Sequence, residues 1–218
     1  MSQPGSFLHA VLNCPVGSFV AAEFKSPGYF LTRLSPQVLE GIVREVREIE
    51  RDFSKAKPWN VQLAGQIKNE FFLPRSHLDT EAYFLDLAQK FSRHYFGHEL
   101  AVGTRLLDLW VNFQRKHEYN PPHTHKGVVS FVIWVQVPFS IEDEMAAVNS
   151  RQTTNPCAAN FAFVYNQANG KIATENIPVD RQFEGLVCVF PSDINHMVYA
   201  FRTSDRFRIS VSGNLGVP

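Results

Sequence analysis

The stretch VSFVIWVQV at residues 129–137 decides the fold class. Apolar side chains occupy every second position, which is how a β-strand fills one face of a sheet. Residues 104–114 (TRLLDLWVNFQ) repeat the pattern, and their expected core face carries Leu107, Leu109, Val111 and Phe113. Further short runs at 161–165, 186–190 and 207–211 are separated by Gly, Pro and Asn. This series of short strands predicts a mainly β chain built as a sandwich or barrel.

The first hundred residues have a different character. Ser35-Pro36 is a helix start, with an N-cap hydroxyl and a proline at the first helical position, followed by apolar residues at helical spacing up to Ile49. A second helix is expected from Asp79-Thr80 to about Tyr95, and residues 59–67 between the two helices are expected to be a strand or an extended segment covering the core. We therefore expect one domain over residues 1–218. In it, residues 1–103 support a β core formed by residues 104–218.

Composition excludes several classes of protein. The chain has 218 residues, of which 44% are hydrophobic and 19% charged, so it can bury a core. Lys+Arg and Asp+Glu both total 21, which argues against a protein that binds nucleic acid through bulk charge. Cys14, Cys157 and Cys188 form no CxxC pair, so neither a disulfide framework nor a thiolate zinc site is expected. The sequence shows neither a membrane span nor a signal peptide, and we expect a cytoplasmic protein.

Three motifs in the β half carry the chemistry. The first is NPPHTH at residues 120–125, where two prolines precede a His-x-His pair. The second is FPSDINH at residues 190–196, which places His196 directly after a strand and a turn. The third is RFRIS at residues 206–210, where two arginines and a serine alternate along a strand. His94 and His98 are four residues apart on the second helix, but without the HExxH pattern we expect no metal there.

These residue types favour a metal site beside a carboxylate site. Imidazoles from different strands suit iron, zinc, copper or nickel and leave coordination positions open. An arginine paired with a serine two residues later can bind a carboxylate through its guanidinium and the hydroxyl. The spacing alone leaves two arginines, Arg206 and Arg208, as alternatives, because alternation would put both on one face. Asn112 and Trp134 are possible pocket residues, whereas Asp193 is expected only to form the turn.

The order of these motifs resembles that of the iron(II)/2-oxoglutarate-dependent oxygenase superfamily. NPPHTHKGVVSFVIWVQVP is similar to the half that carries the first metal ligands, and FPSDINHMVYAFRTSDRFRISVSGNL is similar to the half with the distal histidine and the arginine strand. The closest resemblance is to the small 2-oxoglutarate oxygenases of bacteria and of T4-like phages of cyanobacteria. It extends weakly to the LAGQI segment at residues 63–67.

The resemblance implies a double-stranded β-helix, or jelly roll, with iron(II) bound by His123, His125 and His196. It implies 2-oxoglutarate as co-substrate, with Arg208 and Ser210 matching the family's Arg-x-Ser for its far carboxylate. It also implies a reaction in which O₂ is used, succinate and CO₂ are released, and an unidentified small-molecule or protein substrate is hydroxylated.

Two departures from the family pattern leave alternatives open. No Asp or Glu follows either histidine at the acidic ligand position: this position is held by His125 if His123 is the first ligand, and by Gly127 if His125 is the first. A three-histidine iron dioxygenase that does not use 2-oxoglutarate is therefore one alternative. A non-catalytic jelly roll that binds a metal or a carboxylate is another. The polar stretch Glu142–Pro156 is expected to be a lid or recognition loop. The sequence gives no prediction of the substrate or of the oligomeric state.

Overall fold

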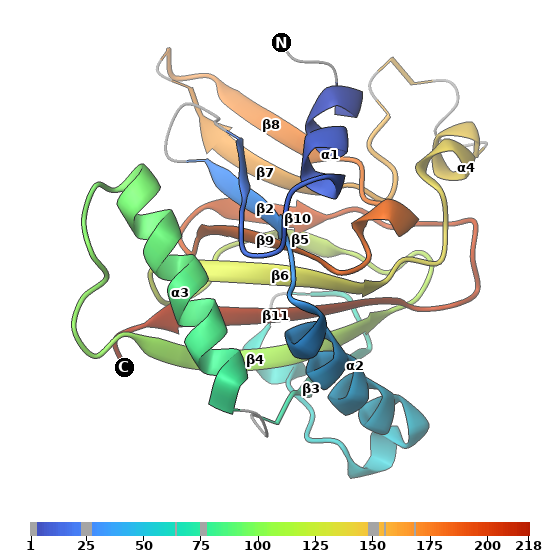
Figure 1. Cartoon of the computed structure of the whole chain (residues 1–218). Helices are drawn as coiled ribbons and strands as arrows, with labels where there is room; N and C mark the ends of the chain where they lie inside the picture. The colour runs from blue at the N-terminus through green and yellow to red at the C-terminus, as the bar shows by residue number, and fades with distance from the viewer. Residues whose placement is uncertain are drawn as a thin grey trace.

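Two antiparallel sheets face each other in the computed structural model, which describes residues 4–22, 28–63, 65–74, 78–147, 153–154, 156–167 and 169–218 (Figure 1). The larger sheet contains, in spatial order, β1 (Val20–Ala22), β2 (Tyr29–Arg33), β9 (Leu186–Pro191), β6 (Val129–Gln136), β11 (Arg208–Gly216), β4 (Arg105–Gln114) and β3 (Asn69–Phe72). The smaller sheet contains β5 (Asn120–His123), β10 (Asn195–Val198), β7 (Phe161–Asn166) and β8 (Ile172–Ile177). This is the jelly-roll arrangement that the sequence predicts.

Helices α2 (Pro36–Arg51) and α3 (Leu78–Tyr95) lie on the outer face of the larger sheet. The predicted start of α2 is confirmed, because the side chain of Ser35 accepts a hydrogen bond from the backbone N–H of Val38. Phe84 of α3 stacks on Phe131 of β6 with ring centroids 4.0 Å apart. Two further α-helices among the described residues are α1 (Pro4–Leu12) and α4 (Ile141–Ala146), and the 3₁₀ turns are η1 (Phe53–Lys55), η2 (Asn60–Gln62) and η3 (Arg181–Phe183).

The alternation in β6 separates two cores. Its odd-numbered residues, from Val129 to Val135, pack under α2 and α3. Val132 and Trp134 point the other way, into the space between the sheets, where they meet Phe161 of the smaller sheet. The inner space therefore receives the even-numbered side chains of β6, β4 and β11, and this is where polar residues of the motifs gather.

The prediction for the start of β4 was wrong by one residue. The pairing of β11 with β4 shifts register between Asn214 and Leu215, so that Leu215 faces Leu106. This bulge reverses the alternation before Asp108, and Leu106 is buried in the outer core in place of Leu107.

The segment at residues 59–67 is not a strand. It contains the 3₁₀ turn η2 followed by an irregular stretch, although it does cover the core as expected, since Leu63 and Ile67 line an inner pocket. Ala64 lies outside the described residues. In the Glu142–Pro156 stretch the structure adds the short helix α4, whereas residues 148–152 and 155 lie outside the described part. No helix in the described ranges combines the length and the hydropathy of a membrane span.

Candidate metal centre

The smaller sheet brings the three predicted histidines together. β5 pairs antiparallel with β10, and His123 at the end of β5 faces His196. Pro121 and Pro122 fit in β5 because it is the edge strand of the sheet. His125 follows two residues later, where its backbone N–H donates to the carbonyl of Ser192 at 2.8 Å. Pairing of one short edge strand thus places side chains from residues up to 73 positions apart in a single cluster.

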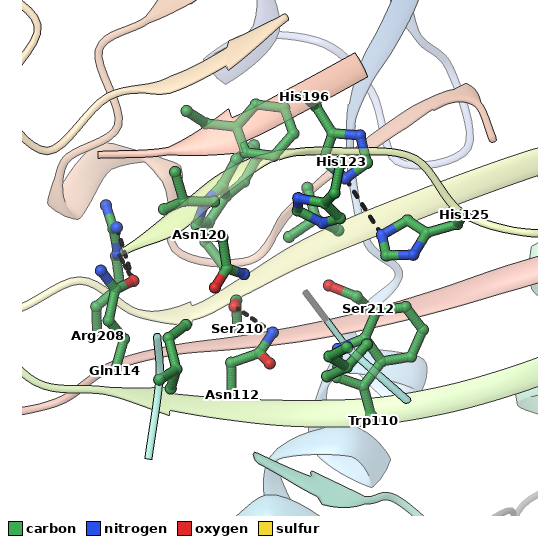
Figure 2. A pocket seen from close by; sticks show the side chains of 16 residues that line it. Trp110, Asn112, Gln114, Asn120, His123, His125, His196, Arg208, Ser210 and Ser212 are labelled. Atoms are coloured by element: carbon green, nitrogen blue, oxygen red, sulfur yellow. Dashed lines mark hydrogen bonds between the residues drawn. The ribbon is translucent and has the colours of Figure 1, made fainter. Parts of the chain in front are cut away.

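The three imidazole rings converge on one point. A nitrogen of each ring lies within 4.8 Å of the corresponding nitrogens of the other two. The Nε2 atoms of His125 and His196 are 3.2 Å apart, and the ring centroids of His123 and His196 are 4.3 Å apart. Figure 2 shows the rings facing one another at one end of the pocket. Among the described residues this is the only group of three or more such side chains placed to hold a metal ion.

Hydrogen bonds fix the orientation of two of these rings. Nδ1 of His123 donates to the carbonyl of Pro121 at 2.7 Å, and Nδ1 of His196 donates to the carbonyl of Ile194 at 3.0 Å. In both rings the proton on Nδ1 leaves Nε2 as a lone-pair atom directed at the cluster. Backbone carbonyls that orient imidazoles in this way are a regular feature of metal sites.

Burial keeps all three imidazoles neutral. It lowers the pKa of His123, and it lowers the pKa of His125 to about 3, with a smaller effect from neighbouring His123. The pKa of His196 lies well below its ordinary value, first because of burial and then because of the other two histidines. A neutral imidazole is the form that binds a metal ion, so the donor set fits a transition metal such as iron(II).

The position of Gly127 bears on the missing acidic ligand. Its backbone has φ +106°, and a Cβ added there would lie 2.6 Å from the carbonyl oxygen of Leu215. A glycine is therefore needed at this position for the turn into β6. The cluster contains His123 and His125 together, which favours the alternative in which His125 holds the place of the acid.

A narrow pocket extends from the histidines between the sheets. Its side chains leave a cavity of about 40 Å³. It is lined by Leu63, Ile67, Trp110, Asn112, Gln114, Asn120, His123, His125, Val132, Trp134, Phe161, His196, Val198, Arg208, Ser210 and Ser212. Asn112 and Trp134, which the alternation marked as possible pocket residues, both line it. Aromatic rings shield the histidine end, where Trp110 meets His125 edge-on at 5.2 Å and Phe190 meets His196 at 4.8 Å.

Arg208 forms the opposite end of the pocket and is 3% exposed. Its Nε and Nη2 donate to Oε1 of Gln114 at 2.9 and 2.7 Å. Nη1 donates to the carbonyl of Ala159 at 2.6 Å, and Nη2 also donates to the carbonyl of Tyr199 at 2.8 Å. Burial lowers the pKa of Arg208 to about 9, against an opposing effect of Glu144, so the group stays charged at neutral pH.

Polar side chains line the space between the two ends. Oγ of Ser210 accepts a hydrogen bond from Nδ2 of Asn112 at 3.3 Å. The Oδ1 atoms of Asn112 and Asn120 are buried without a hydrogen-bond partner among the described residues. Figure 2 shows Asn120 above Ser210, between His123 and Arg208. Because such buried oxygens need hydrogen-bond donors, this region is suited to a polar ligand or to water.

Arg206 does not share the pocket with Arg208. β11 begins at Arg208, so residues 204–207 form a turn and the expected alternation does not reach Arg206. Its Nη2 lies 3.3 Å from Oε1 of Gln136, in an open hollow that Arg47 and Arg181 also line. The expectation that both arginines lie on one face was therefore wrong.

Sequence reasoning assigned no role to four groups around the pocket. Gln114 lies on β4, Asn120 is the first residue of the NPPHTH motif, and Leu63 comes from the segment over the pocket. Glu70 of β3 lies under that segment, is 1% exposed, and accepts a hydrogen bond from Nδ2 of Asn60 at 3.1 Å. Burial and the nearby Glu118 raise the pKa of Glu70 to about 7. Only Gln114 had a usable signal, since alternation in β4 places it beside Asn112.

Comparison with protein families shows which family this site resembles. Residues 108–214, which carry the three histidines and Arg208, match a family described as "Putative 2OG-Fe(II) oxygenase". This region belongs to the 2OG-Fe(II) oxygenase family. The resemblance seen in the sequence motifs is confirmed, and the oxygenase family itself implies iron(II), 2-oxoglutarate and O₂. No curated protein matches the sequence.

Solved structures share the fold of this chain at low sequence identity. A prolyl-4-hydroxylase of Pseudomonas putida is 12% identical, with a TM-score of 0.51 over 99% of this chain and 100% of that one. A Trichoplax adhaerens prolyl hydroxylase, solved with a hypoxia inducible factor peptide, is 10% identical, with a TM-score of 0.53 over 98% and 90%. The non-heme α-ketoglutarate-dependent epimerase SnoN is 13% identical, with a TM-score of 0.55 over 99% and 82%. At these identities the likeness establishes the jelly-roll fold alone.

Proposed function

We propose that this chain is an iron(II)- and 2-oxoglutarate-dependent oxygenase that hydroxylates its substrate, with residues 1–218 acting as one domain. His123, His125 and His196 are the proposed metal ligands. The supporting observation is that three neutral imidazoles, one buried and two partly buried, lie in one pocket with a buried, charged arginine. A metal site alone would not require that cation, and a carboxylate site alone would not require the histidines.

The far carboxylate of 2-oxoglutarate is proposed to bind at the arginine end. Arg208 supplies the positive charge, and Ser210 supplies a hydroxyl on the same face of β11, two residues away. Arg208 can form two parallel hydrogen bonds with charge on both donor and acceptor, whereas Ser210 is an uncharged donor, which favours Arg208 as the main source of affinity. Arg206 is not part of this proposal, because its side chain lies in a different hollow.

At the other end, the protein prepares the imidazoles to act as ligands. The carbonyls of Pro121 and Ile194 hold the Nδ1 protons, so Nε2 of His123 and Nε2 of His196 are directed inward without rotation. Trp110 and Phe190 exclude water from the same end. Iron(II) bound there would supply positions for O₂ and for the keto-acid end of the co-substrate, so that substrate oxidation is coupled to release of succinate and CO₂.

The test is succinate formation by the purified protein with iron(II), 2-oxoglutarate, ascorbate and O₂. We expect slow turnover even without a substrate, and none in the His196→Ala variant under the same conditions. Succinate at the level of the protein-free blank, from protein that holds stoichiometric iron, would reject the proposal. It would favour the non-catalytic jelly roll instead.

The three-histidine set also favours a second candidate, an iron dioxygenase that needs no 2-oxoglutarate. The two functions differ in what O₂ consumption depends on. With candidate substrates, an oxygen electrode should record uptake only after 2-oxoglutarate is added if the first proposal holds. Uptake that is unchanged by omitting 2-oxoglutarate would support the second candidate.

A further inference from the structure

Gln114 holds the guanidinium of Arg208 through two hydrogen bonds to one amide oxygen. Both side chains are 3% exposed, and the guanidinium presents its Nε and Nη2 edge to a single oxygen, Oε1 of Gln114. Nε2 of Gln114 donates to the carbonyl of Glu118 at 2.6 Å. That second bond fixes which end of the amide faces Arg208, because only the oxygen can accept from a guanidinium. The guanidinium is therefore held on one side by an amide whose own orientation is fixed by a hydrogen bond.

Every direct acceptor around Arg208 is neutral. They are the amide oxygen of Gln114 and the carbonyls of Ala159 and Tyr199. No described carboxylate lies within ion-pair distance of this guanidinium. Glu144 acts on it only at longer range, and its own oxygens accept from the backbone N–H groups of Arg202 and Thr203. The pocket thus contains a buried cation whose charge no neighbouring anion balances.

We infer that Gln114 is a positioning residue whose lack of charge determines the affinity for the co-substrate. It orients the guanidinium as an anion would, but leaves the positive charge for an incoming carboxylate. A glutamate at this position could accept the same two hydrogen bonds from Arg208 and would neutralise it within the protein, although it would lose the bond to the Glu118 carbonyl. The inference rests on the proposed function, since it assigns the far carboxylate of 2-oxoglutarate to Arg208.

The Gln114→Glu substitution tests this with almost no change in shape. Binding of 2-oxoglutarate can be followed anaerobically in the iron(II)-loaded protein by the fluorescence of Trp110 and Trp134, which line the pocket. We expect the variant to bind 2-oxoglutarate more than about tenfold more weakly, as loss of one charge-assisted contact predicts. Its affinity for the metal should not change. Equal affinity of Q114E and wild type for 2-oxoglutarate would overturn the inference.

A ligand without the far carboxylate separates the effect of the lost positive charge on binding from general damage to the pocket. A monocarboxylic 2-oxo acid keeps the keto-acid end but lacks the far carboxylate, so Q114E and wild type should bind it alike. The matched control is Gln136→Glu, because Gln136 also accepts from two arginines, Arg47 and Arg206, but outside the pocket. Weakened binding of 2-oxoglutarate by Q136E, equal to that of Q114E, would contradict the local role of Gln114.

Two further measurements keep the inference testable if binding or folding fails. Without any ligand, Gln114→Glu should lower the melting temperature less in the wild-type background than in an Arg208→Gln background, because the counter-charge helps only where the cation is present, whereas the lost bond to the Glu118 carbonyl is common to both. An equal change in the two backgrounds would contradict the inference even if wild type failed to bind 2-oxoglutarate, which would itself reject the proposed function. If Q114E does not fold, Gln114→Met decides: this variant cannot hold Arg208, and unchanged affinity for 2-oxoglutarate would overturn the positioning role.

Discussion

The histidine end of the pocket is partly buried and the arginine end is buried, but only the arginine end keeps a charge. At the histidine end, burial lowers the pKa of each ring, so the site consists of lone pairs with no positive charge. At the arginine end, the pKa falls only to about 9, and the cation is surrounded by neutral oxygens. One end is therefore complementary to a cation and the other to an anion. A dicarboxylate bound to a metal ion would satisfy both at once.

Replacing one of the proposed metal-ligating histidines should have the largest effect on ligand binding. His196→Ala should lower iron(II) affinity by more than about 100-fold, since loss of even an outer-shell partner costs about 10- to 100-fold. Metal content after gel filtration and titration with Co(II) are the measurements. His98→Ala, an exposed histidine beyond the end of α3, is the control. Stoichiometric iron in folded His196→Ala would disprove the ligand assignment.

Removing the charge from the other end should leave the metal in place. Arg208→Ala should weaken 2-oxoglutarate binding by about 10- to 100-fold, the range expected for hydrogen bonds to a charged group. Iron binding should be unchanged, so the two ends would be separable in one pair of titrations. Arg206→Ala is the matched control, and a larger loss in this variant than in Arg208→Ala would reverse the roles of the two arginines.

Glu70 is a third buried ionisable group beside the pocket, and its protonation state decides whether it adds a negative charge there. Its pKa of about 7 lies above the ordinary value of 4.5, so the folded protein holds this proton more tightly than the unfolded chain does. Stability conferred by the protonated form is complete below about pH 4.5 and is lost as the pH rises through 7.

Glu70→Gln should therefore be more stable than wild type at pH 8, by about 2 kcal/mol after allowance for solvent screening. The difference should disappear near pH 4.5. Urea unfolding of both proteins across this range measures it, with Glu40→Gln on the exposed face of α2 as control. A difference that does not change with pH would show that Glu70 has an ordinary pKa.

The smallest effect on 2-oxoglutarate binding is expected for Ser210, which lies between the two ends of the pocket. Ser210→Ala removes one hydroxyl and leaves Nδ2 of Asn112 without its partner at 3.3 Å. The hydroxyl is an uncharged donor, and a typical hydrogen bond contributes about 0.5–1.5 kcal/mol, so 2-oxoglutarate should bind about two- to tenfold more weakly. A loss as large as that of Arg208→Ala would show that the hydroxyl, and not the charge, dominates the arginine end.

The alternation along β6 and β4 was predicted from the sequence, whereas β2 and β8 were not predicted. β6 and β4 alternate because one face packs under helices and the other lines the inner space. β2 (YFLTR) is buried on nearly all sides, so it shows no period of two, and β8 is a half-exposed edge strand. Neither strand shows enough contrast between apolar and polar positions to be predicted.

The site shows the same division. The histidines and Arg208 could be predicted because few residue types bind metals or carboxylates. The bulge that moves Leu106 into the core and the turn that removes Arg206 from the pocket depend on pairing between distant strands. Alternation places Gln114 beside Asn112, but its role depends on the contact with Arg208, 94 residues away.

The facing positions of His123 and His196 have a mechanical consequence. β5 pairs only with β10, and both strands end their pairing at these two residues. An ion bound by both imidazoles would act as a cross-link that fastens an edge strand to its single neighbour. Loss of the ion would then allow the edge strand β5 to separate from β10 while the seven-stranded sheet keeps its pairing.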